Sequence, residues 1–199
     1  FDLAHALKKY EIDLMLYINF TAAYFPKYGQ KPGEEAIHAE ATFSEYEQFC
    51  CEVFEEIGFR YGELIKGWWI DSCYQVHRQY IAVDFARIYM ASKAGYADRI
   101  TTFNYWVLPV VTKHLDYWAG EVCDIIKLPE ALKYTYGCAK GIVPHVLLLM
   151  EDNWWHDKKD QIIPAPRLRS AELATFIRGM NACGGMVTIN LQIYQDGGV

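Results

Sequence analysis

Apolar residues follow two alternating patterns along this chain, one with helical spacing and one with short continuous runs. Over the first ten residues, apolar side chains recur every three or four positions, at Leu3, Ala6, Leu7 and Tyr10. This spacing predicts a helix. The run from Ile12 to Phe20 then shows little alternation, as expected for a strand buried on both faces. A helix that leads into a buried strand is the repeating unit of a parallel α/β sheet.

The same pairing predicts four further strands, each with a helix or a turn before it. A helix over Phe43–Lys66 begins with the capping-box spacing of Ser44 and Glu47 and ends at Gly67. Later helices are expected over Arg78–Ala94, over Glu130–Ala139 and from Ser170 to Gly184. The four strands are expected at Trp68–Asp71, Arg99–Trp106, Pro144–Met150 and Met186–Leu191.

Five strands that alternate with helices indicate a parallel sheet with right-handed crossovers. A complete (β/α)8 TIM-type barrel takes about 250 residues, and this chain has 199. We therefore expect an α/β fold in a single domain over residues 1–199. It is either an incomplete (β/α)8 TIM-type barrel, with about five of its βα units, or an open doubly wound sheet. No glycine-rich phosphate motif follows a strand, which disfavours a nucleotide-binding fold.

The amino-acid composition mainly excludes some classes of function. Hydrophobic residues make up 52% of the chain and charged residues 22%, which is typical of a packed domain and not of a disordered one. The net charge of -6 comes without a cluster of Lys or Arg, so nucleic acid and anionic membranes are poor candidate partners. Aromatic residues reach 16%, and the abundance of Trp and Tyr suits weakly polar ligands such as sugars.

Cysteine usage and the amino terminus bear on cofactors and compartment. The six cysteines form no CxxC pair, so we expect buried thiols, not disulfides or a zinc site. We expect no metal and no organic cofactor. No run is long enough to cross a membrane, and no signal peptide is recognisable. The chain opens at Phe1 without an initiator methionine, so an earlier segment is compatible with the sequence.

The most informative motif is a Trp-rich strand that ends on an acid, Gly67-Trp68-Trp69-Ile70-Asp71-Ser72. Asp71 would lie at the carboxyl end of a buried parallel strand, where α/β barrels place their catalytic groups. This position favours a catalytic carboxylate. The alternative is a turn residue or the N-cap of a following helix.

Polar residues also end the other predicted strands, at Asn19, Asn104, Glu151 and Asn190. Polar groups that converge among aromatic side chains are typical of a sugar pocket, although strand ends are polar in many proteins. The candidate ligand contacts are Trp69, Asn104, Trp106, Trp118, Trp154, Trp155 and His156.

Hydrolysis of a glycoside with retention requires two carboxylates about 5 to 5.5 Å apart, one as nucleophile and one as acid/base. Asp71 would be the nucleophile. The acid/base is either Glu121, in a predicted loop among aromatic and small residues, or Glu151 at its strand end. Each of these residues also has an interpretation without a catalytic role: Glu121 as a solvated loop residue and Glu151 as a helix cap. We interpret His145, early in its strand, as a core residue and not as a base.

Taken together, these segments resemble the α-L-fucosidases of glycoside hydrolase family 29 over nearly the whole chain. Asp2–Phe20 is similar to a helix and strand of those enzymes. Trp68-Trp69-Ile70-Asp71-Ser72 is similar to their Trp-Phe-Asp-Gly motif, with Ser72 in place of the usual glycine. Shorter similarities lie at Thr101–Asn104, Asp116–Glu121, Asn153–His156, Gly184–Asn190 and Tyr194–Gly197.

The resemblance implies the carboxyl-terminal part of the catalytic barrel of an exported, retaining exo-glycosidase that cleaves terminal fucose from a glycan by double displacement. In that case Asp71 is the nucleophile and Glu121 the acid/base, while Trp69, Asn104, Trp118, Trp154 and His156 bind the sugar. The family's earlier strands, whose histidines hold the fucose hydroxyls, have no counterpart here, so part of the sugar site is expected outside this chain. A catalytically inactive carbohydrate-binding barrel and a glycosidase of another specificity are the alternatives.

Overall fold

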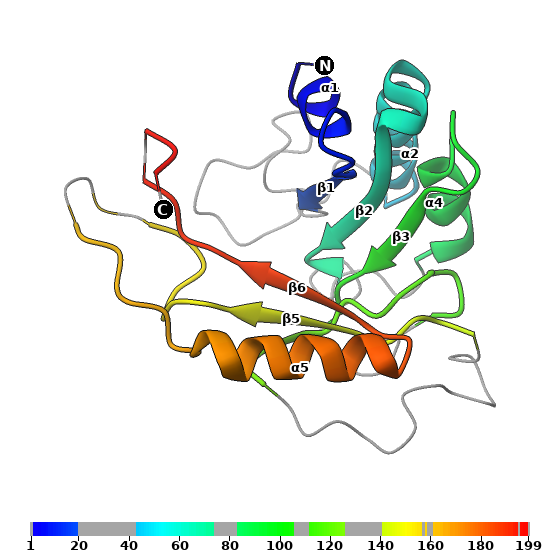
Figure 1. The fold of residues 1–199 in the computed structure, drawn as a ribbon. Helices are drawn as coiled ribbons and strands as arrows, with labels where there is room; N and C mark the ends of the chain where they lie inside the picture. Colours follow the sequence, from blue (N-terminus) through cyan, green and yellow to red (C-terminus); the bar gives the residue numbers. More distant parts are fainter. Residues whose placement is uncertain are drawn as a thin grey trace. The chain divides into compact units, whose positions relative to one another are not determined.

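Parallel sheets and the helices beside them make up the described part of the chain (Figure 1). The structure is a computed structural model that describes residues 2–19, 43–73, 83–105, 112–125, 141–156, 158, 161–194 and 196–198. The chain divides into two compact units. The first comprises Phe1–Tyr105 and Val111–Tyr117, and the second comprises Trp106–Val110 and Trp118–Val199.

The first unit contains a parallel sheet of order β1-β2-β3. Each strand is preceded in the chain by a helix. The elements in chain order are α1 (Asp2–Lys8), β1 (Leu14–Asn19), α2 (Phe43–Tyr61), the 3₁₀ helix η3 (Gly62–Leu64), β2 (Ile65–Asp71), α4 (Phe85–Ser92) and β3 (Ile100–Phe103).

The second unit contains a parallel sheet of order β4-β5-β6. Its strands are β4 (Glu121–Cys123), β5 (His145–Leu149) and β6 (Met186–Asn190). The helix α5 (Ser170–Ala182) connects β5 to β6 and runs beside them in Figure 1. Val146 and Leu148 of β5 pack against Phe176 and Met180 of α5 in the core of this unit.

The expected α/β class with parallel strands is confirmed, and helices alternate with strands from α1 to β3 and again from β5 to β6, whereas β3, β4 and β5 follow one another without a helix in the described residues. The structure describes six strands instead of the predicted five. The additional strand, β4, contains Glu121, which the sequence placed in a loop. β4 has three residues and an irregular register, with Cys123 at φ 62°, so it is too short to show a periodic pattern. The described residues do not show a complete barrel, and the incomplete barrel and the single domain stay predictions.

The predicted boundary between the second helix and the second strand was wrong. The helix was expected to end at Gly67, but α2 ends at Tyr61 and β2 begins at Ile65. Gly62 adopts a φ of 52° just after α2, a conformation that favours glycine and ends helices. Gly67 instead lies inside the sheet, where a Cβ atom would come within 2.6 Å of Met15 Cε and 2.9 Å of Ile100 Cγ1.

Two other expectations differ in detail or fall outside the described residues. Within the described residues, the predicted helix Arg78–Ala94 corresponds to α4 and the predicted strand Arg99–Trp106 to β3, while residues 78–82 and 106 lie outside the described part of the chain. The helix expected over Glu130–Ala139 lies outside the described residues. The Glu47 carboxylate accepts hydrogen bonds from the Asp84 N–H at 3.2 Å and from Arg87 Nη1 at 2.9 Å, and the predicted capping box with Ser44 stays a prediction.

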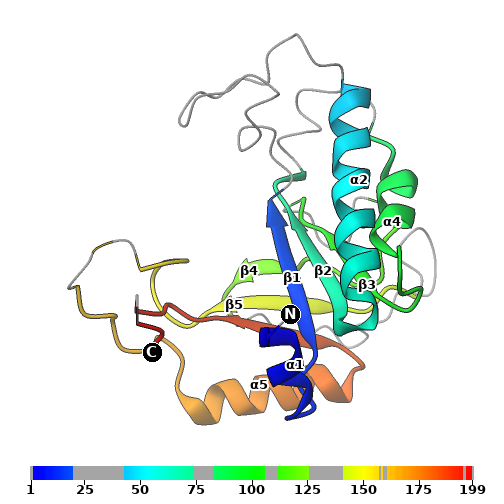
Figure 2. The same ribbon diagram turned by 90° about the horizontal axis from the view of Figure 1, so that it is seen from above.

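Helices α2 and α4 cover one face of the first sheet (Figure 2). Phe54 of α2 meets the buried Trp68 edge to face at 5.0 Å, and Phe85 of α4 meets Phe103 in the same way at 5.1 Å. Since successive strand residues point to opposite faces, Trp69 and Asp71 lie on the other face. The packing of the helices on one face of the sheet therefore leaves Trp69 and Asp71 on the face that α2 and α4 do not cover.

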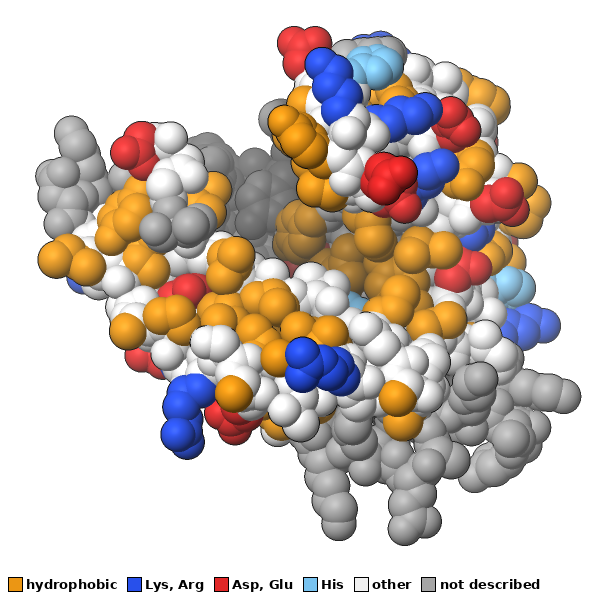
Figure 3. Space-filling view, viewed as in Figure 1, with side chains coloured by type: hydrophobic (Ala, Val, Ile, Leu, Met, Phe, Trp, Pro, Cys, Tyr) orange, Lys and Arg blue, Asp and Glu red, His pale blue; other side chains and the backbone are white. Residues whose placement is uncertain are grey.

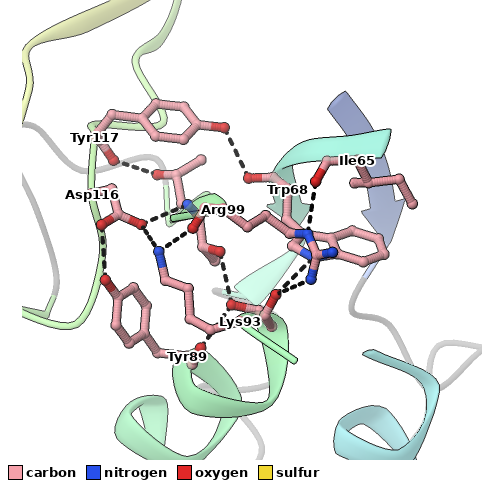
Figure 4. A network of polar contacts seen from close by, with 10 residues as sticks. Ile65, Trp68, Tyr89, Lys93, Arg99, Asp116 and Tyr117 are labelled. Carbon is pink, nitrogen blue, oxygen red and sulfur yellow. Dashed lines mark hydrogen bonds and ion pairs between the residues drawn. The ribbon is translucent and has the colours of Figure 1, made fainter. Parts of the chain in front are cut away.

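A buried arginine joins the helices to the amino ends of β2 and β3 (Figure 4). The side chain of Arg99 is 0% exposed. Its guanidinium group donates hydrogen bonds to carbonyl oxygens near the carboxyl ends of α2 and α4 and at the start of β2. These acceptors are Gly58, Gly62, Ser92, Ala94 and Ile65, at 2.6 to 3.4 Å. A cation is favourable at the negative end of a helix dipole, so one side chain satisfies the ends of two helices.

The same network holds the segment before the second unit. Asp116 accepts hydrogen bonds from Lys93 Nζ at 2.6 Å, from Tyr89 Oη at 2.8 Å and from the Thr101 N–H at 2.7 Å. Burial and the bond to Asp116 raise the pKa of Tyr89 to about 12, so its phenol remains a hydrogen-bond donor. Tyr117 donates to the Trp68 carbonyl at 2.8 Å. These bonds tie residues 116–117 to β2 and β3.

Charged side chains of both signs lie at the surface of the first unit near α1 (Figure 3). Lys8 of α1 pairs with Glu63 of η3 at 3.1 Å, and both side chains are exposed. Four acidic residues of α2 and η3 are exposed to solvent: Glu52, Glu55, Glu56 and Glu63. No helix in the described ranges is long and apolar enough to cross a bilayer.

The cysteines of the described residues are free thiols. Cys50, Cys51 and Cys73 are buried, as the sequence predicted, whereas Cys123 and Cys183 are half-buried. Cys138 lies outside the described residues.

Candidate active site

Asp71, the last residue of β2, is held by three hydrogen-bond donors. The phenol of Tyr17 donates to its Oδ2 at 2.6 Å. The side-chain amide of Asn104 donates to its Oδ1 at 2.8 Å, and the N–H of Ser72 donates to the same atom at 2.7 Å. Two of these donors are side chains on neighbouring strands or strand ends, and hydrogen bonds to a charged carboxylate of this kind orient it.

The register of the parallel strands explains why these side chains meet. Asn19 pairs with Asp71, and Tyr17 pairs with Trp69. Asn104 directly follows β3, whose Phe103 pairs with Ile70. The carboxyl ends of all three strands therefore lie at one edge of the sheet, as the positions of Asn19, Asp71 and Asn104 in the sequence predicted.

Ser72 adopts a backbone conformation that normally favours glycine. Its φ is 61°, which costs a non-glycine residue about 1 to 2 kcal/mol. The buried Ser72 hydroxyl accepts a hydrogen bond from Asn19 Nδ2 at 3.1 Å. The left-handed turn thus explains the glycine usual in the similar motif, and the Asn19 bond offsets part of the strain here.

Tyr17 and Trp69 form an aromatic surface beside the carboxylate. Their rings stack with centroids 5.7 Å apart and planes 19° from parallel, a favourable offset geometry. Tyr17 is 60% exposed. Tyr17 was not predicted as a site residue, although its position indicates it: Tyr17 precedes Asn19 by two residues on one strand, so both side chains share a face.

A buried thiol lies directly after this site. Burial, together with the charge of Asp71, raises the pKa of the Cys73 thiol well above its usual value. Cys73 therefore remains uncharged and adds no second anion beside Asp71. Its N–H donates to the Asn104 carbonyl at 3.2 Å, which also helps to place Asn104.

Within the described residues, no group of His, Cys, Asp and Glu side chains has the arrangement of a metal site.

Glu121 belongs to the second unit, where it is the first residue of β4 and half-buried. It pairs with Leu147 of β5. The next residue, Val122, packs against the core that α5 covers, so Glu121 points to the opposite face of the sheet. Asp71 lies in the other unit, and the predicted pairing of Glu121 with it stays a prediction.

Glu151, the other candidate acid/base, follows β5 and is only 5% exposed. Its Oε2 accepts the Gln192 N–H at 3.0 Å. Gln192 Nε2 in turn donates to the Asn153 carbonyl at 3.0 Å. Glu151 therefore ties the loop after β5 to the segment after β6, and this contact gives it a structural role.

The predicted sugar contacts of the second unit that the structure describes differ in exposure. Trp154 is half-buried, and its carbonyl accepts a bond from Asn190 Nδ2 at 2.9 Å. His156 Nε2 donates to the Gln161 carbonyl at 2.6 Å, and its ring meets Tyr194 at 5.2 Å. Trp118 is 5% exposed, whereas Trp155 is 62% exposed. Their roles in sugar binding stay predictions, and Trp106 lies outside the described residues.

Solved structures of similar fold are endo-fucoidan hydrolases of glycoside hydrolase family 107. P5AFcnA has a TM-score of 0.69 at 13% identity, over 100% of this chain and 65% of its own. MfFcnA9 has a TM-score of 0.67 at 14% identity, over 96% of this chain and 42% of its own. MfFcnA4 has a TM-score of 0.62 at 14% identity, over 96% and 36%.

At such low identity, this likeness shows a shared fold. The chain spans between 36% and 65% of the length of these three structures. They are family 107 enzymes, so the similarity to family 29 motifs is supported only as a coarse resemblance to fucose-related glycoside hydrolases. No protein-family model and no curated protein sequence matches the chain.

Proposed function

We propose that this chain is part of a retaining glycoside hydrolase that acts on a fucose-containing carbohydrate. The observation that carries the proposal is the Asp71 carboxylate, oriented by Tyr17, Asn104 and Ser72 at the carboxyl edge of a parallel sheet. The fold likeness to enzymes named as fucoidan hydrolases supports the same substrate class.

The hydrogen bonds support different tasks for the two oxygens of Asp71. Oδ1 accepts two bonds, from Asn104 and Ser72, whereas Oδ2 accepts one from Tyr17. Oδ2 therefore has more lone-pair density available, and we assign it the attack on the anomeric carbon. The stacked rings of Tyr17 and Trp69 offer an apolar surface for the C–H face of a sugar beside that atom.

Glu121 would act as the acid/base of a double displacement. In the first step, Asp71 forms a bond to the anomeric carbon while the bond to the leaving oxygen breaks and Glu121 protonates that oxygen. In the second step, Glu121 takes a proton from water, the water oxygen bonds to the anomeric carbon, and Asp71 is released. The configuration of the sugar is retained because it is inverted twice.

Two positions of cleavage are supported by different observations. The motif resemblance favours release of a terminal fucose, as an α-L-fucosidase performs it. The names of the fold neighbours instead favour cleavage inside a fucoidan chain. A chain that binds fucosylated glycan without any hydrolysis is the remaining alternative, because a fold does not fix an activity.

Product analysis separates these possibilities. The longest natural chain that contains this sequence would be incubated with 4-nitrophenyl α-L-fucoside and, separately, with fucoidan. Release of 4-nitrophenol, with the α-anomer of fucose seen first by NMR, is the expected result. Oligosaccharides from fucoidan alone would establish internal cleavage, and a first-formed β-anomer would contradict the retaining mechanism. Sugar binding without any product would favour the binding-only alternative.

Replacement of Tyr17 with phenylalanine should lower kcat by about tenfold or more. The variant keeps the aromatic ring but loses the hydrogen bond that orients Asp71 Oδ2 for attack and stabilises the carboxylate as it is released in the second step, and such bonds to a charged group contribute about 1.5 to 3 kcal/mol. Tyr10→Phe is the matched control, because Tyr10 is 77% exposed near the end of α1. Equal kcat values for the two variants would contradict a role of the Tyr17 phenol.

A further inference from the structure

His145 lies at the start of β5 with both ring nitrogens bonded inside the protein. Its side chain is 1% exposed. Nδ1 lies 2.8 Å from the Trp118 carbonyl and 2.9 Å from the Ala119 carbonyl, and Nε2 lies 2.8 Å from the Thr188 hydroxyl. Carbonyl oxygens only accept, so Nδ1 carries the proton and Nε2 accepts from Thr188.

The imidazole remains neutral in this setting. Burial lowers the pKa of His145 to about 4, so a single tautomer persists at neutral pH. The ring is enclosed by the protein, which confirms the interpretation of His145 as a core residue.

The two carbonyls belong to the segment that leads into β4. Backbone hydrogen bonds also hold that segment against β5. The Trp118 N–H donates to the Val143 carbonyl at 3.0 Å, and the Leu147 N–H donates to the Gly120 carbonyl at 2.7 Å. Gly120 has a φ of 64°, and a Cβ atom there would lie 2.1 Å from the His145 carbonyl oxygen. The segment therefore has no freedom to shift toward β5, and Glu121 follows it directly.

We infer that His145 is a positioning residue: its imidazole fixes the Trp118–Gly120 segment and thereby sets where Glu121 presents its carboxylate. The inference rests on the proposed acid/base role of Glu121. Thr188 of β6 takes part by bonding to the far side of the ring, so His145 of β5 links the segment before β4 to β6.

Two substitutions at position 145 separate positioning from general support of the fold. His145→Asn keeps a side-chain N–H near the place of Nδ1, whereas His145→Gln keeps a polar group near the place of Nε2. Only the first can still donate to the Trp118 and Ala119 carbonyls.

The kinetic measurements would use the longest natural chain and two substrates. One is a fucosyl disaccharide, whose leaving group needs protonation, and the other is fucosyl fluoride, whose leaving group does not.

We expect His145→Gln to lower kcat for the disaccharide by about tenfold or more, with KM unchanged and with little effect on fucosyl fluoride. His145→Asn should restore most of the loss. Hydrogen exchange of the Leu147 amide should be faster in His145→Gln than in His145→Asn. Equal losses for both substrates, or equal behaviour of the two variants, would overturn the inference.

Glu121→Gln distinguishes a failure of this inference from a failure of the proposed function. If this variant hydrolyses the disaccharide as well as the wild type, Glu121 is not the acid/base, and the catalytic part of the inference is overturned with it. The exchange rates at Leu147 still decide in that case whether His145 holds the segment. If Glu121→Gln is impaired and His145→Gln is not, the inference alone is wrong.

Discussion

Asp71→Asn should lower the hydrolysis of 4-nitrophenyl α-L-fucoside by at least about a thousandfold, because loss of a nucleophile removes the covalent route altogether. The fold should persist, since asparagine has nearly the same shape and an oxygen that can accept from Ser72 and Asn104. Activity is measured by release of 4-nitrophenol, and folding by a thermal unfolding curve on the same sample.

Azide gives this experiment a second readout. A small anion can occupy the space beside the asparagine and attack the anomeric carbon, so part of the activity should return as fucosyl azide. Asp98→Asn is the matched control, because Asp98 is exposed in the turn before β3. Near-normal turnover of Asp71→Asn in a folded protein would remove Asp71 from the role of nucleophile.

Arg99→Met should destabilise the protein by about 3 kcal/mol or more. Methionine fills much of the space of the arginine stem but donates no hydrogen bond, so the carbonyls of Gly62, Ser92, Ala94 and Ile65 lose a buried donor. Each unsatisfied buried carbonyl costs about 1 to 3 kcal/mol before the structure relaxes. The free energy of unfolding is measured by urea denaturation.

Two further variants test the cause of this loss. Arg99→Lys keeps the charge but has a single nitrogen, so it should lie between the wild type and Arg99→Met. Arg60→Met removes a cation of the same kind whose ion pair with Glu56 is exposed, and it should change stability by no more than about 0.5 kcal/mol. If the urea midpoint of Arg99→Met equalled that of Arg60→Met, the buried hydrogen bonds of Arg99 would contribute nothing to the free energy of unfolding.

The arrangement of Arg99 also illustrates why sequence patterns missed the scaffold beneath the site. From the sequence, Arg99 was expected only as the first residue of a strand. The carbonyl oxygens that accept its hydrogen bonds at the helix ends lie between residues 58 and 94, and their positions form no periodic pattern in the sequence. The same holds for Tyr17, which became a candidate only when the register placed it beside Trp69 and Asp71. Long-range polar contacts depend on which elements pack together, and that is not encoded in local spacing.

The sequence by itself determined the α/β class, the order of most helices and strands and the acidic end of β2, because buried runs and helical spacing are local consequences of burial. The tertiary structure alone decided that Tyr17 and Asn104 hold Asp71, that Gly67 serves close packing of strands, that Glu121 lies in a strand and that His145 binds the segment before it. The physical reason is register: a shift of one residue along a strand would turn each of these side chains to the other face of its sheet.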